Sequence, residues 1–569
     1  MASFLRSLVR AASLLATLAL GCAGAHAATC PDQFDPNSPV LSSGFAHDLS
    51  NTRNAPSSID SSNIGQLVLR LSQNDSSVNE RRTAPLLTEQ AIVFTSGRNL
   101  TAMSRQSGCT YWTYQVDRKS TFLVGANGAR SSSLAYIHEP GQPPLIAVGD
   151  FYGKVHTVDA RTGKLVWVRF LGDDAKHNLI TGGFQVHESK LFVPVSTKEV
   201  YTVVIDLFNA CCVSHGLLHV VDAYTGKTLW TYVPTGQNTT YSSVTQSRGP
   251  SGVSMIGVAA IDPARRQVYV GTGENLSLPT TANSDAIVAL DLDTGLPKWV
   301  FQGTANDAWN AACAAPPGLD RKCPHKKNEG DFDFSAPPIL TKTPSGRDIV
   351  VAGQKSGTVY ALDPATGAKM WERKLGMGGS LGGVHWGMAV DSRKVYAAVA
   401  DLYVNKLSRL ATGDLGTAGA SSGVQSATAP GERLVANGKP GLYALNLETG
   451  QIVWERHITR STLDGRTVPV IFSAALTVTN DVLLASGLDG MVRALNTADG
   501  ADVWSFNTAI SFTDTDGHTG QGGTIDSVGA IVGGTDVLIN SGYNIFGGAN
   551  DFQAGPGSAL FVLRLNKRH

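Results

Sequence analysis

Residues 158–167, which read VDARTGKLVW, decide the expected fold. They combine the end of an alternating apolar strand, an Asp-x-x-Thr-Gly turn and a second strand that carries Trp167. The Asp side chain caps such a turn, and Gly takes a positive φ without a Cβ clash. This stretch therefore predicts a β-hairpin.

The same pattern returns along the chain. Its tryptophans are spaced at roughly 50 to 80 residues, the period of a propeller blade with insertions. The copies are VDAYTGKTLW to Trp230, LDLDTGLPKW to Trp299, LDPATGAKMW to Trp371, LNLETGQIVW to Trp454, LNTADGADVW to Trp504 and a worn MSRQSGCTYW to Trp112. Seven blades are predicted on this basis, with the tryptophans packing between blades and taking no part in catalysis.

The two ends of the chain complete the ring. The C-terminal SALFVLRL lacks the turn and the tryptophan, and the early LVLRLS can pair with it in an eighth blade. Joining both ends in one blade removes the open sheet edge. The predicted fold is therefore an all-β, eight-bladed β-propeller.

Composition agrees with many short strands and excludes some partners. The chain has 569 residues, 61 of them Gly, and its 46 Lys plus Arg balance 46 Asp plus Glu. Nucleic acids and acidic membrane surfaces require a basic face, so neither is expected as the main partner.

The N-terminus has the form of an export signal. Residues 1–27 contain a basic start, a short apolar run and the small-x-small end Ala25-His26-Ala27. We expect cleavage after Ala27, a single propeller domain over residues 28–569 and a periplasmic or secreted protein. A lipoprotein signal that ends at Cys22 is the alternative. No later run is long and apolar enough for a transmembrane segment.

Six cysteines follow the predicted cleavage site, and an even number in an oxidising compartment suggests three disulfides. Cys313 and Cys323 are expected to close a surface loop. Cys211 and Cys212 can pair with each other, which leaves Cys30 for Cys109. For the adjacent pair, bonds elsewhere or free thiols remain open.

Several longer stretches carry a family resemblance. They are HDLSNTRNAP, DAWNAAC, DFDFSAPPIL, GRDIVVAGQKSGTVYALDPATG, GGVHWGMAVD and GGTIDSVGAIVGG. Together with the Trp-containing repeat, they resemble the pyrroloquinoline quinone (PQQ) dehydrogenases, and in particular the polyvinyl alcohol dehydrogenase branch. The resemblance covers nearly all of the mature chain. It implies PQQ in the central channel and a bridging Ca²⁺, with another divalent ion or a lanthanide as the alternative.

The resemblance also implies residue roles. Thr181 and Ser196 fall where the family binds the cofactor's carboxylates, and Glu199 falls at the calcium glutamate. Lys355 matches the position that donates to the quinone oxygens. Arg130 resembles an early arginine that pairs with a PQQ carboxylate, which suits a guanidinium fork.

Further positions are expected to line the cofactor. His385 and Trp386 fall where the family places a polar contact beside an aromatic ring. Cys211–Cys212 follows the glutamate, as in the polyvinyl alcohol branch, and would form a flat plate against the planar cofactor.

Three positions depart from the family pattern. Asn310 stands where methanol dehydrogenases carry their proposed catalytic Asp; it can ligate calcium but cannot act as a base. Asp307, the nearest carboxylate, is the candidate base. Glu274 replaces a frequent Asn ligand and gives a more anionic metal site, and Ile256 replaces the usual Trp floor.

The sequence thus predicts an exported PQQ-dependent dehydrogenase of secondary alcohols that passes electrons to a separate acceptor such as a cytochrome c. No Cys-x-x-Cys-His is present for a built-in haem. The alternative is a propeller that has lost cofactor chemistry and serves as a scaffold or binding protein.

Overall fold

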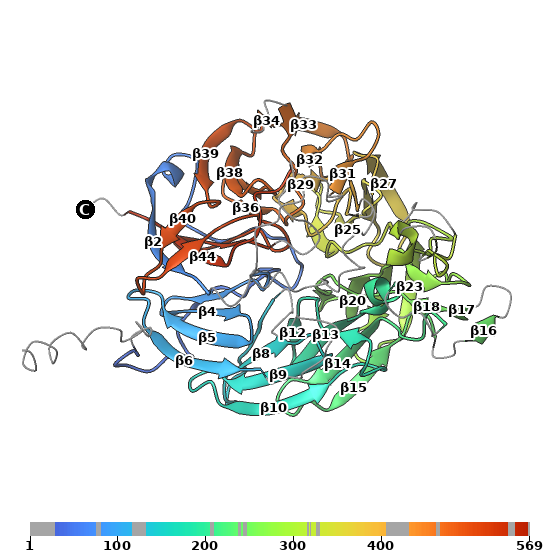
Figure 1. The fold of residues 1–569 in the computed structure, drawn as a ribbon, viewed down its shortest axis with the longest axis horizontal. Coiled ribbons are helices and arrows are strands. Elements are labelled where there is room, and N and C mark those ends of the chain that lie inside the picture. The colour runs from blue at the N-terminus through green and yellow to red at the C-terminus, as the bar shows by residue number, and fades with distance from the viewer. Residues whose placement is uncertain are drawn as a thin grey trace, which may run out of the picture.

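The computed structural model of the chain describes residues 29–75, 81–116, 133–204, 210–236, 240–242, 247–315, 318, 320–325, 331–379, 381–404, 432–461, 467–543 and 552–566. These residues form eight antiparallel sheets of four or five strands, which Figure 1 shows arranged as a ring around a common centre. The prediction of an eight-bladed propeller is confirmed.

The strands of the first four blades follow the chain. Blade 1 contains β1 (Val40–Ser42), β3 (Leu86–Thr88), β4 (Ala91–Ser96), β5 (Asn99–Ser104) and β6 (Thr110–Gln115). Blade 2 contains β7 (Ala135–Ile137), β8 (Leu145–Gly149), β9 (Lys154–Asp159) and β10 (Leu165–Phe170). Blade 3 contains β11 (Asn178–Leu179), β12 (Gln185–His187), β13 (Lys190–Thr197), β14 (Leu217–Asp222) and β15 (Thr228–Tyr232). Blade 4 contains β19 (Ala260–Asp262), β20 (Gln267–Gly271), β22 (Ala286–Asp291) and β23 (Pro297–Gln302).

The remaining blades complete the ring. Blade 5 contains β24 (Ile339–Lys342), β25 (Asp348–Gly353), β26 (Thr358–Leu362) and β27 (Lys369–Lys374). Blade 6 contains β28 (Ala389–Val390), β29 (Lys394–Val399), β32 (Gly441–Asn446) and β33 (Ile452–Arg456). Blade 7 contains β36 (Thr477–Thr479), β37 (Val482–Ser486), β38 (Met491–Asn496) and β39 (Asp502–Asn507). Blade 8 contains β42 (Ala530–Gly533), β43 (Asp536–Ser541), β44 (Ala559–Leu565) and β2 (Leu67–Gln73).

Short two-stranded ribbons and helical turns lie in the loops that connect the blade strands. Five two-stranded ribbons are β16 (Thr240–Ser242) with β17 (Ser247–Gly249), β18 (Ser251–Gly252) with β21 (Asn275–Ser277), β30 (Leu402–Val404) with β31 (Glu432–Leu434), β34 (Thr459–Ser461) with β35 (Thr467–Pro469), and β40 (Ser511–Thr513) with β41 (Thr519–Gln521). The helical turns are η1 (Ile64–Gln66), α2 (Glu199–Thr202) and η2 (Ala311–Ala314).

Blade 8 joins the two ends of the chain, as predicted. Strand β2 pairs antiparallel with β44, so that Leu67 lies opposite Leu565 and Gln73 opposite Leu560. Figure 1 shows these strands side by side despite their separation in sequence. This pairing closes the ring between the last and the first blade.

The repeated turn forms a contact between neighbouring blades. Asp159 Oδ1 accepts hydrogen bonds from the Thr162 backbone N–H and hydroxyl, both at 2.8 Å. Gly163 has a φ of 68°, and a Cβ there would lie 2.6 Å from Cε3 of Trp112 in the preceding blade. Equivalent glycine–tryptophan contacts join Gly226 to Trp167, Gly295 to Trp230, Gly367 to Trp299, Gly450 to Trp371 and Gly500 to Trp454.

Buried apolar side chains gather between adjacent blades. Each interface around the ring has its own cluster, because both faces of a blade are apolar. The cluster between blades 8 and 1 also contains the central residues Val258, Trp386 and Tyr543.

An N-terminal segment, residues 49–55, crosses the inner edges of several blades. Its backbone bonds to Ile261 of blade 4, Leu340 of blade 5, Val390 of blade 6 and Val478 of blade 7. The HDLSNTRNAP stretch is therefore a structural tie across the ring.

Candidate active site

Three buried carboxylates from blades 4 and 5 converge beside a buried lysine. Glu274 follows β20, and Asp331 and Asp333 precede β24; their oxygens lie within 4.8 Å of one another. Lys355, in the turn between β25 and β26, places its Nζ 3.1 Å from Asp331 Oδ1 and 2.8 Å from Asp333 Oδ2. Carboxylate oxygens in such a group are the ligands that Ca²⁺ and other hard cations prefer.

Burial and repulsion between like charges raise the pKa values of the carboxyl groups in this cluster. Burial and the neighbouring Asp331 and Asp333 raise the pKa of Glu274 well above its usual value, although Lys355 opposes the shift. Burial and Asp333, opposed by Lys355, raise the pKa of Asp331 to about 7. Burial opposes the charge on Lys355, but the surrounding carboxylates outweigh it and raise its pKa.

Asp307 and Asp285 extend this acidic region. Asp307 Oδ2 accepts from the backbone N–H groups of Asp331 at 3.1 Å and Phe332 at 2.9 Å, so it holds the segment that carries the two aspartates. Asp285 is fully buried, and neither of its oxygens has a hydrogen-bond partner. Its pKa is raised well above the usual value by burial and then by Asp307, Glu274, Asp333 and Asp331.

The group has too little positive charge for its carboxylates. Lys355 interacts with three buried carboxyl groups, those of Glu274, Asp331 and Asp333, and Asp285 and Asp307 add two more carboxyl groups in electrostatic range of these acids. Unpaired buried carboxylates are costly, so they either keep protons or bind a cation. The orphaned oxygens of Asp285 and the three converging ligands fit a bound metal ion.

Glu199 lies in the neighbouring blade but outside this three-carboxylate group. It begins α2 directly after β13, and its Oε2 accepts from Val213 N at 2.9 Å, Ser214 N at 2.7 Å and Ser214 Oγ at 2.5 Å. Ser254 connects the two blades: its Oγ accepts from Thr197 N and its carbonyl from Gly273 N. Glu199 and Glu274 thus follow adjoining backbone segments.

Asn310 makes hydrogen bonds within its own region of the chain. Its Oδ1 accepts from Ala312 N at 2.9 Å and caps η2, while its Nδ2 donates to Leu276 O at 2.9 Å and Lys322 O at 3.0 Å. The amide is therefore committed to the fold of its loop. Asp331 and Asp333 are the residues that lie beside Lys355.

The predicted disulfides are all present: Cys30–Cys109, Cys211–Cys212 and Cys313–Cys323. Cys211 and Cys212 are buried in a cluster that includes Trp309 and Leu276. Backbone hydrogen bonds join both cysteines to Arg248. This packing fixes the adjacent pair close to the loop that Asn310 caps.

Thr181, Ser196 and Ile256 lie close together near the end of β13. Thr181 Oγ1 lies 3.0 Å from Ser196 Oγ, and Ser196 Oγ donates to the carbonyl of Met255 at 2.9 Å. Ile256, the next residue, is partly buried and packs against the central cluster that contains Trp386. This arrangement brings predicted polar contacts beside a predicted apolar floor.

His385 and Trp386 lie next to each other, with ring centroids 4.7 Å apart. His385 Nδ1 lies 2.9 Å from Ser473 Oγ. Burial and then the charges of Lys355 and Arg82 lower the pKa of His385 well below its usual value, so the ring is neutral. Arg130 lies outside the described residues.

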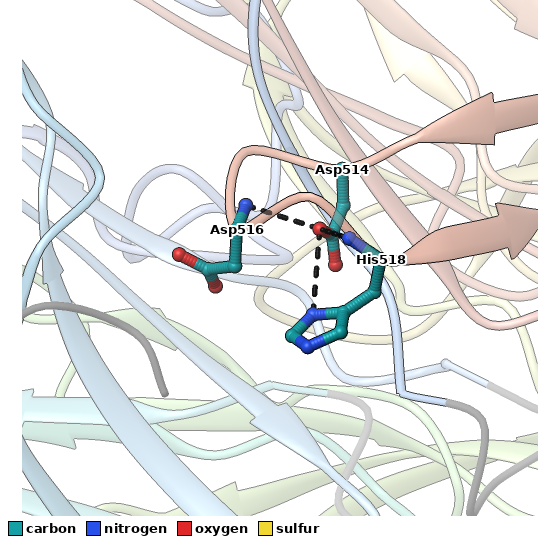
Figure 2. Close-up of side chains that lie close together, drawn as sticks. All are labelled: Asp514, Asp516 and His518. Carbon is teal, nitrogen blue, oxygen red and sulfur yellow. Dashed lines mark hydrogen bonds and ion pairs between the residues drawn. The ribbon is translucent and has the colours of Figure 1, made fainter. Parts of the chain in front are cut away.

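A separate group of two carboxylates and one histidine lies in the turn between β40 and β41. Figure 2 shows Asp514, Asp516 and His518 there. Asp514 Oδ1 accepts from the backbone N–H groups of Asp516 at 3.0 Å and His518 at 2.8 Å. These bonds explain the group as a capped turn.

Sequence reasoning missed Asp285, Asp331 and Asp333. The two aspartates of DFDFSAPPIL were part of a quoted signature, and their alternation with Phe332 and Phe334 was an available signal. Alternation places both carboxylates on one side of an extended segment. Nothing in the sequence around Asp285 indicated a role, because the burial of its carboxylate without a hydrogen-bond partner arises only in the folded chain.

Comparison with known proteins now identifies the family. The profile of the glucose/ethanol/alcohol dehydrogenase β-propeller domain, a PQQ domain, matches residues 45–329. The profile of the outer membrane protein assembly factor BamB matches residues 355–541. The polyvinylalcohol dehydrogenase of Sphingopyxis sp. (strain 113P3) is 31% identical over 479 residues, which are 82% of this chain and 67% of the relative. That of Pseudomonas sp. is 30% identical over 497 residues, 85% of this chain and 70% of the relative.

Solved structures support the same fold. The quinohemoprotein alcohol dehydrogenase from Comamonas testosteroni has a TM-score of 0.64 at 18% identity, covering 93% of this chain and 81% of that one. A europium-containing methanol dehydrogenase has a TM-score of 0.65 at 17% identity, covering 93% and 98%.

The chain therefore belongs to the PQQ-dependent, or quinoprotein, alcohol dehydrogenase family. Within the family it is similar to the polyvinyl alcohol dehydrogenase branch, and it is a PQQ-dependent alcohol dehydrogenase. In the described part of the chain, no helix has the length and apolar character needed to cross a bilayer.

Proposed function

We propose that this enzyme oxidises secondary alcohols of the polyvinyl alcohol type and passes the electrons to a separate carrier such as a cytochrome c. Two relatives named polyvinylalcohol dehydrogenase, each covered to about two thirds, support the substrate class. We further propose export, with residues 1–27 as a cleaved signal before a single propeller domain over residues 28–569.

We assign the metal to Glu274, Asp331 and Asp333, with Glu199 as a further ligand candidate from the adjoining blade. Calcium is the proposed ion. The excess of carboxylates beside one lysine also favours ions of higher charge, so a lanthanide is the alternative.

PQQ, when bound, would supply a quinone able to take two electrons from an alcohol, and a metal held by Glu274, Asp331 and Asp333 would supply Lewis acidity. Lys355 would offer a donor and a fixed positive charge to the cofactor. Asp307 keeps the base role expected from the sequence and would accept the proton of the substrate hydroxyl. Its Oδ2 also accepts hydrogen bonds from the backbone N–H groups of Asp331 and Phe332, which positions the two aspartates assigned to the metal.

The observation that carries this proposal is the contact of Lys355 with Asp331 and Asp333 beside Glu274. A purely structural propeller has no need for a buried charge group that interrupts apolar packing, since such groups usually destabilise the fold. The BamB profile match over residues 355–541 keeps the scaffold as the second candidate.

Dye-linked oxidation of a secondary alcohol by the mature protein, loaded with PQQ and calcium, tests the proposal. We expect PQQ-dependent turnover that falls at least 100-fold in Asp333→Asn or Asp331→Asn. A matched Asp502→Asn variant, in an exposed ion pair with Arg456, should leave turnover unchanged. A loaded protein that oxidises primary alcohols only would refute the substrate class, and a protein without any turnover would favour the scaffold.

A further inference from the structure

A short backbone segment at the end of β18 bridges the two segments that carry Glu199 and Glu274. The N–H of Gly252 donates to the carbonyl of Ser214 at 2.9 Å, and Ser214 in turn holds the Glu199 carboxylate through its own N–H and hydroxyl. The N–H of Val253 donates to the carbonyl of Glu274 at 2.8 Å. Neighbouring residues of one segment thus bond to the support of one glutamate and to the backbone of the other.

Ser254 adds a second pair of contacts to this bridge. Its Oγ accepts from the N–H of Thr197 at 3.2 Å, and Thr197 lies two residues before Glu199. Its carbonyl accepts from the N–H of Gly273 at 2.9 Å, and Gly273 directly precedes Glu274. The bridge therefore reaches the backbone beside each glutamate twice, so their relative position depends on its geometry.

The bridge holds a valine in a conformation that valine rarely adopts. Val253 has a φ of 57° and is fully buried. The left-handed region is unfavourable for a β-branched residue, and such strain persists only where the surrounding contacts over-determine the backbone. Gly252 precedes it with a φ of 83°, so two consecutive left-handed residues bend the chain between the contact with Ser214 and the contacts of Ser254.

The neighbouring chain is fitted closely to this bend. Gly216 donates its N–H to the carbonyl of Gly252 at 2.7 Å, and a Cβ on Gly216 would collide with the carbonyl oxygen of Val253. A glycine at position 253 would relieve the strain but would also admit other backbone conformations. The buried valine therefore restricts the bridge to one geometry.

We propose that Val253 and Ser254 are positioning residues that set the separation between Glu199 and Glu274, so that both carboxylates reach one cation. Since the two glutamates come from different blades, holding them in place in advance lowers the ordering cost of metal binding. Groups that orient metal ligands without touching the metal commonly contribute about 10- to 100-fold to its affinity. This inference rests on the proposed metal site.

Isothermal titration of the cofactor-free protein with calcium tests the inference. Val253→Gly and Ser254→Ala should each raise the dissociation constant for calcium by about 10-fold or more. In a Glu199→Gln background, Val253→Gly should cost little further affinity, because the valine acts through that glutamate. Ser189→Gly is the matched control. It relaxes another left-handed residue, with a φ of 58°, directly before β13 and at the opposite end of that strand from Thr197, and it should bind calcium as the wild type does.

Urea denaturation of the same metal-free variants separates positioning from folding. A purely structural role would lower stability and leave the calcium affinity of the folded protein unchanged, and that result overturns the inference while the proposed site stands. A full loss of affinity from Val253→Gly in the Glu199→Gln background also overturns it, because the valine would then act by another route. A wild type that binds no calcium overturns the proposed calcium site and the inference with it. Should Val253→Gly fail to fold, Ser254→Ala decides, because it removes one acceptor and keeps the buried valine.

Discussion

The amine of Lys355 lies 2.8 Å from Asp333 and 3.1 Å from Asp331, and no other lysine or arginine of the described chain forms an ion pair with either carboxylate. Asp331 and Asp333 belong to the segment before β24, and Lys355 to the turn after β25, so the contact fixes two loops of blade 5 at the centre of the ring. Glu274 brings blade 4 to the same point.

Removing the charge of Lys355 should destabilise the metal-free protein. Lys355→Gln leaves several buried carboxylates without a counter-charge, so we expect a loss of about 3 kcal/mol or more in unfolding free energy of the metal-free protein. Lys355→Arg should retain most of that stability. Urea denaturation measures both, and Lys369→Gln, from an exposed pair with Glu372, serves as the control. A Lys355→Gln protein as stable as the wild type would show that the carboxylates are already neutral.

The metal-free protein should lose stability as pH rises. Asp331 has a pKa raised from 3.8 to about 7, and the pKa values of Glu274 and Asp285 are also raised. The folded state then binds more protons than the unfolded state between the two pKa values, so unfolding free energy falls as pH rises from about 4 through about 7. Thermal melts across this window should show the decline, and saturating calcium should flatten it. A flat profile without metal would contradict this account.

Replacing each of two glutamates in adjoining blades by glutamine should change the stability of the metal-free protein in opposite directions. Glu274→Gln removes a carboxylate from a repulsive group and should raise the melting temperature of the metal-free protein. Glu199→Gln replaces the charged acceptor of three donors by a neutral amide and should lower it, by roughly 1–3 kcal/mol in unfolding free energy. Differential scanning calorimetry without metal makes the comparison. Destabilisation by both substitutions would mean that Glu274 is not under electrostatic strain.

The glycine of the repeated turn should be required for blade packing as well as for the turn. Gly163→Ala places a methyl group 2.6 Å from the Trp112 ring in a backbone with a φ of 68°. We expect a loss of at least about 2 kcal/mol, because the left-handed conformation and the clash both contribute. Gly141→Ala has a φ of 80° and no atom within 4 Å, so it should show the backbone penalty alone. Equal losses in the two variants would remove the packing role.

The fold was predictable because its information is local and repeated. Each copy of the pattern around Trp167 contains its own turn cap and strand, and the pairing of β2 with β44 follows from the need to close the ring. The even number of cysteines suggested three disulfides, and the structure contains the three favoured pairings, including Cys211–Cys212, for which the sequence left alternatives open.

The site was predictable only in part. The sequence singled out Glu274 and Lys355, which lie in the buried charge group, but the Trp-Asn pair at Trp309 drew attention to Asn310 rather than to the aspartates of DFDFSAPPIL. The loop closed by Cys313–Cys323 lies between these two stretches, so sequence proximity to the tryptophan was misleading. Which acidic segment reaches Lys355 depends on how blades 4 and 5 pack, and no local pattern encodes that.

Calcium binding is the most direct test of the central claim that Glu274, Asp331 and Asp333 form the metal site of a PQQ enzyme. Isothermal titration of the cofactor-free protein with calcium, with and without PQQ, should give one site that tightens when PQQ is present. The site should be lost or weakened at least 10-fold in Asp333→Asn and unaffected in Asp514→Asn, whose turn lies elsewhere in the ring. Calcium binding that survives Asp333→Asn, Asp331→Asn and Glu274→Gln alike would contradict the account.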